Sequence, residues 1–567
     1  MKKIFPFFIL CFLSSPFLSA QGILGGRVTG NFQTDIQSSR ADSVIGASKL
    51  EDKMRINAFA NILYTQDNFT AGFRYESYLN PVLGFDNEYK GAGIPFRFAS
   101  YKKDFLEITL GNYYEQFGNG LIFRSYEERN LGLDNAMDGI RLVAKPYKGV
   151  ILKGLVGKQR YYWEDVWQND NGLVRGADAE LNFNELMPKF AASDLRITLG
   201  GSFVSVYEKA GTENIVQPNG LYNDVYQLSV PANVGAGAFR WNIGYKNFTL
   251  QGEYAQKGQD PNAMNNYIYH KGNALLLAAD YSIKGFALRF EGKRIDNMSF
   301  KSKRNLSGRM LNVNYLPAIT RQHSYSLMSM YSYATQLNGE MGFQIDAMYK
   351  IKKGTLLGGA NGTDVKLNYS YVSSIDKTPI EGIALNQKGT LGYESKFFSK
   401  GDDKYFEEIN FEINKKFSRS YKMNFMYSYQ EFNPIAYGHD GNPMIYAHIL
   451  VAEGIYRFAS RNSLKGELQV LMTKQDYDEF AKGDWLQIGA EYNLKGRCFF
   501  SLSDQWNYGT EQGDKVHYYN VSVGYTLNTT RVQLSYGKQR QGILCIGGVC
   551  REVPASNGLF MTITSSF

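Results

Sequence analysis

The segment from residue 113 to residue 141 gathers the side chains best suited to act on a charged solute. Its glycines, among them Gly118 and Gly120, allow the backbone to bend sharply. If the segment turns into a water-filled passage, opposed guanidinium and carboxylate groups form a constriction with a transverse electric field. If it packs on a surface, the same charges pair within one loop, and the sequence favours neither arrangement. The charged residues are Glu115, Arg124, Glu127, Glu128, Arg129, Asp134, Asp138 and Arg141.

Two further loops each concentrate one sign of charge. Residues 475–483 include Asp476, Asp478 and Glu479, whose spacing matches no defined calcium loop, so we interpret them as surface charge. Residues 298–322 are basic and could hold phosphate groups or steer anions, although a solvated loop is the simpler interpretation. Their cationic residues are Lys301, Lys303, Arg304, Arg309 and Arg321.

The cysteines and histidines indicate structure rather than catalysis. Cys545 and Cys550 flank a turn at Gly547 and Gly548 that brings them together, so we expect a disulfide. Closing so small a loop contributes about 2 kcal/mol in the entropy model. Cys498 begins an apolar stretch, and we interpret it as an unreactive apolar side chain. The histidines form no metal-spaced group and no nucleophile motif, so we expect neither an enzyme nor a bound metal or cofactor.

Strands must position these loops, because apolar and polar residues alternate through almost the whole chain. Clear examples are residues 69–76, 286–293, 409–414, 484–494 and 519–527. A period of two with one apolar face is typical of a half-buried strand. The polar faces carry Arg74, Glu76, Arg289, Glu291, Lys293, Asp346, Lys366, Glu408, Glu412 and Glu491.

The amino terminus has the form of a signal peptide. Lys2 and Lys3 precede an apolar run and then Ser19-Ala20, which predicts cleavage after Ala20 and a mature chain of residues 21–567. No later segment is apolar for the about 18 residues that a membrane helix needs. An exported chain with 41 Tyr, 37 Phe, 57 Gly and only 4 Cys fits a closed barrel. The net charge of +8 comes without a nucleic-acid-binding motif, so no nucleic acid is expected.

Connections alternate between tight turns and long loops, as in outer-membrane barrels. Counting a weak strand near residues 388–398 gives about 26 strands, and we expect an even number between about 22 and 26. The chain is therefore predicted to be all-β, a single transmembrane antiparallel outer-membrane β-barrel over residues 21–567. The expected turns are 66–68, 246–247, 283–285, 418–420, 495–497 and 528–529, and the expected long loops are 36–50, 115–136, 208–233, 259–271, 298–322, 432–444 and 541–556.

The last strand pattern ends on Phe567, which is typical of the assembly signal of outer-membrane barrels. We therefore expect the barrel-assembly machinery to recognise this strand. The barrel pattern begins near Gly22, so no amino-terminal plug domain is expected. A barrel this wide encloses a broad lumen, and its own loops must then fill it.

Several segments resemble a family of large outer-membrane barrels of unknown function from Bacteroidota. They are residues 116–124, 133–139, 316–323 and 353–359. The resemblance implies the outer membrane and a barrel over nearly the whole mature chain. It implies no catalytic or ligand-binding residues.

Two functions fit these features. One is a channel or passive transporter for polar solutes, with a lumen narrowed by inward-folded loops. The alternative is a non-conducting barrel that serves as scaffold or partner in a secretion, assembly or surface complex. Because polar-lined barrels usually conduct, the channel is favoured. The expected partners are outer-membrane lipid, lipopolysaccharide and the assembly machinery.

Overall fold

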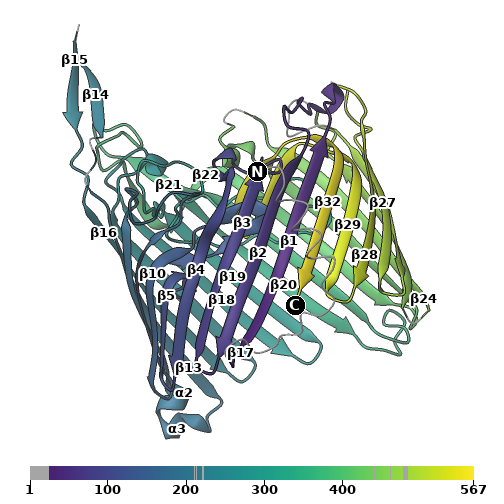
Figure 1. Ribbon diagram of the computed structural model, residues 1–567, viewed down its shortest axis with the longest axis horizontal. Coiled ribbons are helices and arrows are strands. Elements are labelled where there is room, and N and C mark those ends of the chain that lie inside the picture. Colours follow the sequence, from purple (N-terminus) through teal and green to yellow (C-terminus); the bar gives the residue numbers. More distant parts are fainter. Residues whose placement is uncertain are drawn as a thin grey trace.

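The protein is a barrel, seen from the side in Figure 1. The computed structural model describes residues 25–209, 211, 213–219, 222–439, 442–459, 461–476, 483–511 and 513–567. The predicted signal peptide, together with Asp478 and Glu479, lies outside the described residues. Among the described residues, no helix is long and apolar enough to cross a membrane.

The wall is one antiparallel sheet of 24 strands, which closes where β1 pairs with β32. The all-β barrel and its even strand number are as predicted. In chain order the wall strands are β1 (Arg27–Ser39), β2 (Arg55–Gln66), β3 (Phe69–Leu79), β4 (Gly91–Lys103), β5 (Leu106–Tyr113), β10 (Met137–Tyr147), β11 (Val150–Gln159), β12 (Leu173–Asn182), β13 (Leu195–Tyr207), β16 (Asn233–Tyr245), β17 (Phe248–Gln259), β18 (Lys271–Ile283), β19 (Phe286–Asp296), β20 (Gly339–Ile351), β21 (Thr363–Pro379), β22 (Tyr393–Lys416), β23 (Tyr421–Phe432), β24 (Ile445–Ala459), β25 (Asn462–Met472), β26 (Trp485–Leu494), β27 (Cys498–Trp506), β28 (His517–Leu527), β29 (Thr530–Gln539) and β32 (Ser556–Ser566).

Short elements decorate the connections between wall strands. The hairpin β14–β15 projects beyond the rim of the barrel, whereas α2 and α3 lie at the opposite end (Figure 1). The short elements are β6 (Glu115–Gln116), β7 (Arg124–Ser125), β8 (Glu127–Glu128), β9 (Leu133–Asp134), β14 (Asn214–Asn219), β15 (Tyr222–Gln227), β30 (Gly542–Ile546), β31 (Val549–Val553), the helices α2 (Phe183–Leu186) and α3 (Pro188–Ala191), and the 3-10 turns η1 (Ser43–Ile45), η2 (Asn87–Tyr89), η3 (Arg129–Leu131), η4 (Ala263–Asn265) and η5 (Pro434–Tyr437).

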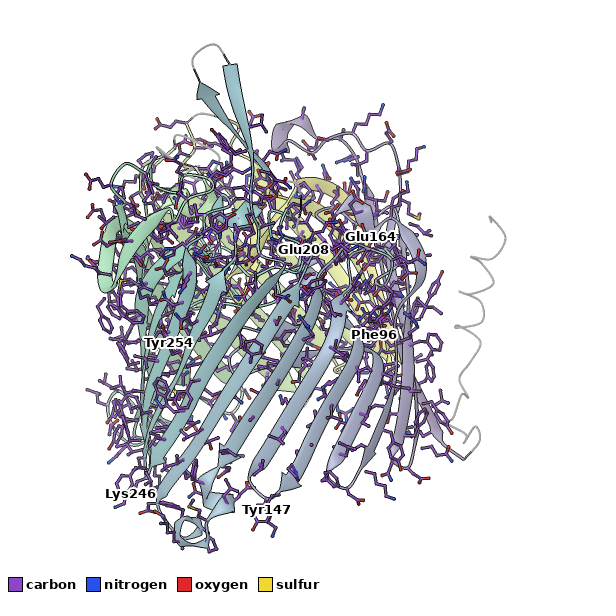
Figure 2. All side chains as sticks on the ribbon, turned by 90° about the vertical axis from the view of Figure 1, so that its left-hand side faces the viewer. Phe96, Tyr147, Glu164, Glu208, Lys246 and Tyr254 are labelled. Atoms are coloured by element: carbon purple, nitrogen blue, oxygen red, sulfur yellow. A yellow bond between two sulfur atoms is a disulfide. The ribbon has the colours of Figure 1, made fainter. Side chains whose placement is uncertain are left out.

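The alternating pattern separates an outer from an inner face. On β3, Phe73 and Tyr75 are 42% and 43% exposed on the outside, whereas Arg74 and Glu76 are 3% and 1% exposed on the inside. The short turns gather at one end, where Tyr147 and Lys246 lie, and the long loops gather at the other, near Glu164 and Glu208 (Figure 2). All six predicted tight turns join consecutive wall strands.

Two predicted boundaries are wrong. No separate strand occurs near residues 388–398, because Tyr393 begins β22, a strand of 24 residues that continues past bulges in its pairing with β21. The long loop predicted for residues 298–322 instead runs from 297 to 338, since no described wall strand intervenes before β20. Together these corrections explain why the count is 24 rather than about 26.

Inward-facing side chains are more exposed near the short turns and more buried near the long loops. On β10, Met137 at the long-loop end is buried, whereas Lys145 near the short turn is exposed. On β13 the buried inner residues are Val204 and Val206, again toward the long loops. Material from the loops therefore fills the half of the lumen near the long loops, whereas the half near the short turns is more open.

Candidate functional site

Three connections between wall strands fold inward and fill the half of the lumen near the long loops. They are residues 114–136 between β5 and β10, 297–338 between β19 and β20, and 540–555 between β29 and β32. We call these three segments together the plug. Two apolar clusters and a set of buried ion pairs hold the plug against the wall.

The first apolar cluster fixes residues 114–136 to one side of the wall. Phe117, Leu121, Ile122 and Phe123 are 0% exposed. They pack in one cluster with Met298, Phe300 and Val313 of the plug and with inward-facing residues of strands β10 to β19. The wall residues of this cluster are Tyr113 at the end of β5 and Met137, Leu155, Val174, Val204, Val206, Val234, Ala236, Ala255, Ala274 and Ile295. Burial of this apolar surface opposes release of the segment into water.

The second cluster fixes residues 319–333 to strands β21 to β26. Leu327, Met328 and Tyr331 of the plug are at most 2% exposed. On β24, the inward residues Ile445, Ala447, Ile449 and Val451 pack against them, although Tyr446 and Leu450 on the opposite face are each 45% exposed. This part of β24 is therefore apolar on both faces because the plug covers its inner face.

The disulfide hairpin locks the centre of the plug. Cys545 and Cys550 are joined by a disulfide between β30 and β31. At the tip of the hairpin, Tyr315 donates a hydrogen bond to the Gly547 carbonyl at 2.7 Å, and the Thr335 amide donates to Gly548 at 3.1 Å. The hairpin thus contacts the residues that link the two apolar clusters.

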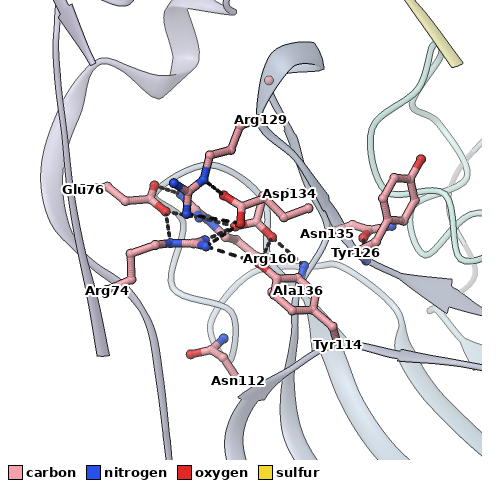
Figure 3. A network of polar contacts seen from close by, with 12 residues as sticks. Arg74, Glu76, Asn112, Tyr114, Tyr126, Arg129, Asp134, Asn135, Ala136 and Arg160 are labelled. Atoms are coloured by element: carbon pink, nitrogen blue, oxygen red, sulfur yellow. Dashed lines mark hydrogen bonds and ion pairs between the residues drawn. The ribbon is translucent and has the colours of Figure 1, made fainter. Parts of the chain in front are cut away.

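A buried charge network joins the plug to β3 and to the β11–β12 loop (Figure 3). Arg160 donates to Asp134 at 2.6 Å, and Arg74 donates to the same carboxylate oxygen. Glu76 pairs with the same two guanidinium groups, at 2.7 Å from Arg160 and 2.6 Å from Arg74. The four side chains are at most 8% exposed. Burial alone would raise the pKa of the Asp134 carboxyl, but the two guanidinium groups hold it below its usual value.

The structure places the other residues of the predicted constriction within packed contacts. Glu115 pairs with Arg141 at 2.7 Å and with Lys153 at 2.8 Å, and the Lys153 amine holds the pKa of Glu115 low against the effect of burial. Arg97 lies 3.5 Å from Asp138.

The remaining four constriction residues lie within the plug. The Arg124 guanidinium lies over the rings of Tyr126 and Tyr315 at 4.2 and 4.0 Å. Glu127 accepts from Arg129 at 2.7 Å, and Glu128 caps η3 by accepting from an amide at 3.3 Å.

Most cations of the basic loop are paired within the protein. Lys303 pairs with Asp170 at 2.6 Å, Arg304 with Glu208 at 3.0 Å, and Arg321 with Glu412. Lys301 donates to the carbonyls of Gly308 and Met310, and burial lowers its pKa to about 7. In the basic loop, Lys301 and Arg309 thus have no carboxylate partner among the described residues.

The remaining predicted sites are also located by the structure. Asp476 accepts from Thr510 at 3.0 Å and from the Glu511 amide. Phe567 closes the barrel seam through two backbone bonds with Gly30, at 3.0 and 3.1 Å. Where the chain is described, no three His, Cys, Asp or Glu residues come together as they would to hold a metal ion.

A cavity of about 610 Å³ lies between the plug and the seam side of the wall. Its wall side consists of inward-facing residues of β28, β29, β32 and β1, and most of them are polar. The wall residues include Gln33, Asp35, Gln37, Asn520, Ser535, Lys538, Phe560 and Thr562, and the opposite side is formed by Phe85, Arg129, Asn130, Leu544, Ile546, Arg551 and Val553. The cavity lies beside the plug in the filled half of the lumen.

Sequence reasoning missed the partners that hold the plug. Arg160 follows β11 as an ordinary loop cation, and nothing in its local sequence indicates a partner across the barrel. The apolar inner wall did leave a signal, since residues 445–452 are apolar at almost every position instead of every second one. Such a strand predicts an inner face that is covered.

Comparisons with known proteins give a family and distant structural likenesses. A family model described as a family of unknown function, DUF6029, matches residues 1–567. No curated protein sequence matches the chain. Similar solved structures include the siderophore receptor PirA from Pseudomonas aeruginosa (9% identity, TM-score 0.39, 95% of this chain and 80% of that chain). They also include the translocation pore of the P pilus usher PapC (10% identity, TM-score 0.40, 95% and 99% covered). Likenesses of this size say nothing about what the chain does.

Proposed function

The chain belongs to the family of unknown function DUF6029, and we propose that it is an outer-membrane barrel that passes small polar solutes along the cavity beside its plug. The observation that carries this proposal is the asymmetry of the lumen. Apolar clusters tie the plug to β10–β19 and β21–β26, whereas a polar wall from β28 to β1 faces a cavity of about 610 Å³.

The outer surface supports a place in the membrane. Large apolar side chains point outward around the wall, among them Phe73, Phe239 and Leu502 at 42%, 51% and 57% exposed. Each would cost free energy in water at about 25 cal/mol per Å² of apolar surface, and a bilayer removes that cost. The short turns at one end and the long loops at the other correspond to the periplasmic and extracellular ends of such barrels.

Conductance of the refolded mature chain in a planar bilayer tests the route. We expect small, steady single-channel currents that polar sugars of increasing size block progressively. Ser535 lines the cavity, so S535W should reduce the current several-fold. Ser503 points to the same lumen from β27 but does not line the cavity, and S503W serves as the matched control. A conducting barrel that S535W leaves unchanged would show that solutes take another path.

The scaffold function stays as a second candidate because the plug is held very firmly. His323 of the plug pairs with Glu408 of β22 at 2.7 Å, and their side chains are 4% and 0% exposed. At the short-turn end, Leu356 and Leu357 are 97% and 67% exposed, a pair that a protein partner could cover. A folded barrel that carries no current, together with photo-crosslinking from position 356 to a defined partner, would favour this function.

A further inference from the structure

We infer that the cavity beside the plug binds an anionic group at Arg551, so that the solutes it takes carry a carboxylate or a phosphate. This inference rests on the proposed function only for the route of the solute. The binding site itself is argued from the charges and contacts of the side chains around the cavity.

Arg551 is a cation without a counter-ion. It lies on β31 and lines the cavity, and no carboxylate of the described residues lies within ion-pair distance of it. Its Nε and Nη1 atoms are buried and have no hydrogen-bond partner among the described residues. By contrast, Arg74 pairs with three carboxylates and Arg160 with two. Buried guanidinium donors left without a partner are costly, and an anionic ligand would remove that cost.

A second cation stands beside Arg551. Arg309 has no carboxylate partner in the described part of the chain, and its Nη1 donates at 3.2 Å to the carbonyl of Cys550, the residue before Arg551. Burial, together with the nearby charge of Arg309, lowers the pKa of Arg551 to about 10. Both groups stay positive at neutral pH, so they attract an anion together.

The other charged groups that face the cavity are already satisfied. Arg129 pairs with Glu127 at 2.7 Å, and Lys538 pairs with Asp42 at 2.9 Å. On the opposite wall, the Asp35 carboxylate accepts from Thr562 at 2.8 Å and from Gln33 at 2.9 Å. Asp35 repels an anion from the wall and so directs it toward Arg551.

The lining beside Arg551 indicates the rest of the ligand. The Arg551 guanidinium lies 4.7 Å from the centre of the Phe85 ring, and Leu544, Ile546 and Val553 line the same side. A guanidinium presents two parallel donors that match a carboxylate or phosphate. The cavity volume of about 610 Å³ is that of a small-molecule site. The fitting solute is therefore a small anion with an apolar body.

Calorimetric titration of the folded, detergent-solubilised barrel tests the site without any need for conduction. The probes are phenyl phosphate and benzoate, with benzyl alcohol and benzylamine as neutral and cationic counterparts. We expect the two anions to bind. In R551Q their affinity should fall at least about tenfold, because a charge-assisted bidentate contact is lost. R551K keeps the positive charge but lacks the paired donors, so its affinity for the two anions should fall several-fold. The control R497Q removes a cation from an exposed turn and should change nothing.

Thermal unfolding separates binding from a structural role. R551Q removes an uncompensated buried cation, so the unfolding temperature should stay or rise; a fall would mean that Arg551 holds the fold together. If R551Q does not fold, the affinity of R551K for the two anions tests the inference instead. Equal binding of benzyl alcohol and benzoate, or undiminished binding by R551Q, overturns the inference. A silent barrel that still binds the anions refutes only the solute route, whereas a conducting barrel that binds none refutes only the site.

Discussion

Replacing Asp134 by asparagine should loosen the plug. Asp134 accepts from Arg160 at 2.6 Å and from Arg74 through the same oxygen, while its other oxygen accepts from Tyr114 at 2.9 Å and from the Ala136 amide at 3.0 Å. An asparagine carbonyl can keep the last two bonds. Its amide group, however, would direct N–H donors at two guanidinium groups that are themselves donors.

The cost can be estimated from the burial of the network. Removing one partner of a buried ion pair costs about 3–5 kcal/mol. Glu76 still shares both arginines, so the low end applies, about 3 kcal/mol. At about 1.4 kcal/mol per factor of ten, the opening equilibrium of the plug rises about 10²-fold.

Hydrogen exchange measures this opening directly. In D134N, amides of residues 126–136 should exchange about 10²-fold faster, while amides of the wall strands keep their protection. E164Q makes the same change of charge at an exposed site in the β11–β12 loop and should leave exchange as it is. Equal protection of residues 126–136 in D134N and the parent chain would refute the view that this network holds the plug.

Three further predictions concern the plug and the seam. The pKa of Asp134 is held low in the folded chain. The stabilisation by its carboxylate is therefore full above the pKa of about 4 in the unfolded chain and is lost as the pH falls below that value. Hydrogen exchange of the plug amides, corrected for the intrinsic rate, should be constant from pH 7 to 5 and become faster near pH 3. Replacing both Cys545 and Cys550 by serine should lower the stability of the hairpin by about 2 kcal/mol. Limited proteolysis should then cut faster within residues 540–555, while the wall strands stay intact. A Cβ on Gly30 would lie 2.6 Å from the Phe567 ring, whereas nothing lies within 4 Å at Gly466; G30V should lower the yield of heat-modifiable folded barrel, and G466V should not.

The wall of the barrel could be predicted because its determinants are local. Alternation at residues 69–76 or 519–527 assigns each side chain to a face, and a slip of one residue would bring Glu408 and Glu412 to the apolar outside. Tight turns are also local, because residues such as Asp67 and Asn528 adopt the left-handed backbone that such turns need. The observed 24 strands lie within the predicted range, but the finer count of about 26 was too high. Residues 323–335 and 388–398 have strand-like stretches, but only pairing with a neighbouring strand makes a wall strand.

The candidate site could be predicted only in part, because its partners are distant in the sequence. The charges of residues 115–141 were visible, and so was their crowding. Their partners were not: Arg74 and Arg160 come from elements 60 and 26 residues away from Asp134. Arg551 is the reverse case, a residue whose significance lies in the lack of a carboxylate nearby, and no local pattern encodes that.

A wide barrel that is filled by its own loops needs anchoring of two kinds. Apolar packing supplies the free energy but little direction, and here it attaches the plug along β10–β19 and β21–β26. Buried polar pairs are direction-specific, since Arg321 pairs with Glu412 and His323 with Glu408 only in one register of the plug. The wall from β28 to β1 contributes no buried residue to either of these clusters, although Tyr518 of β28 packs against the second, and it presents mostly polar side chains to the cavity. A plug packed against every wall strand would fill the lumen, whereas one that leaves the wall from β28 to β1 largely uncovered leaves a lined path, and Arg551, which has no carboxylate partner among the described residues, stands on that path.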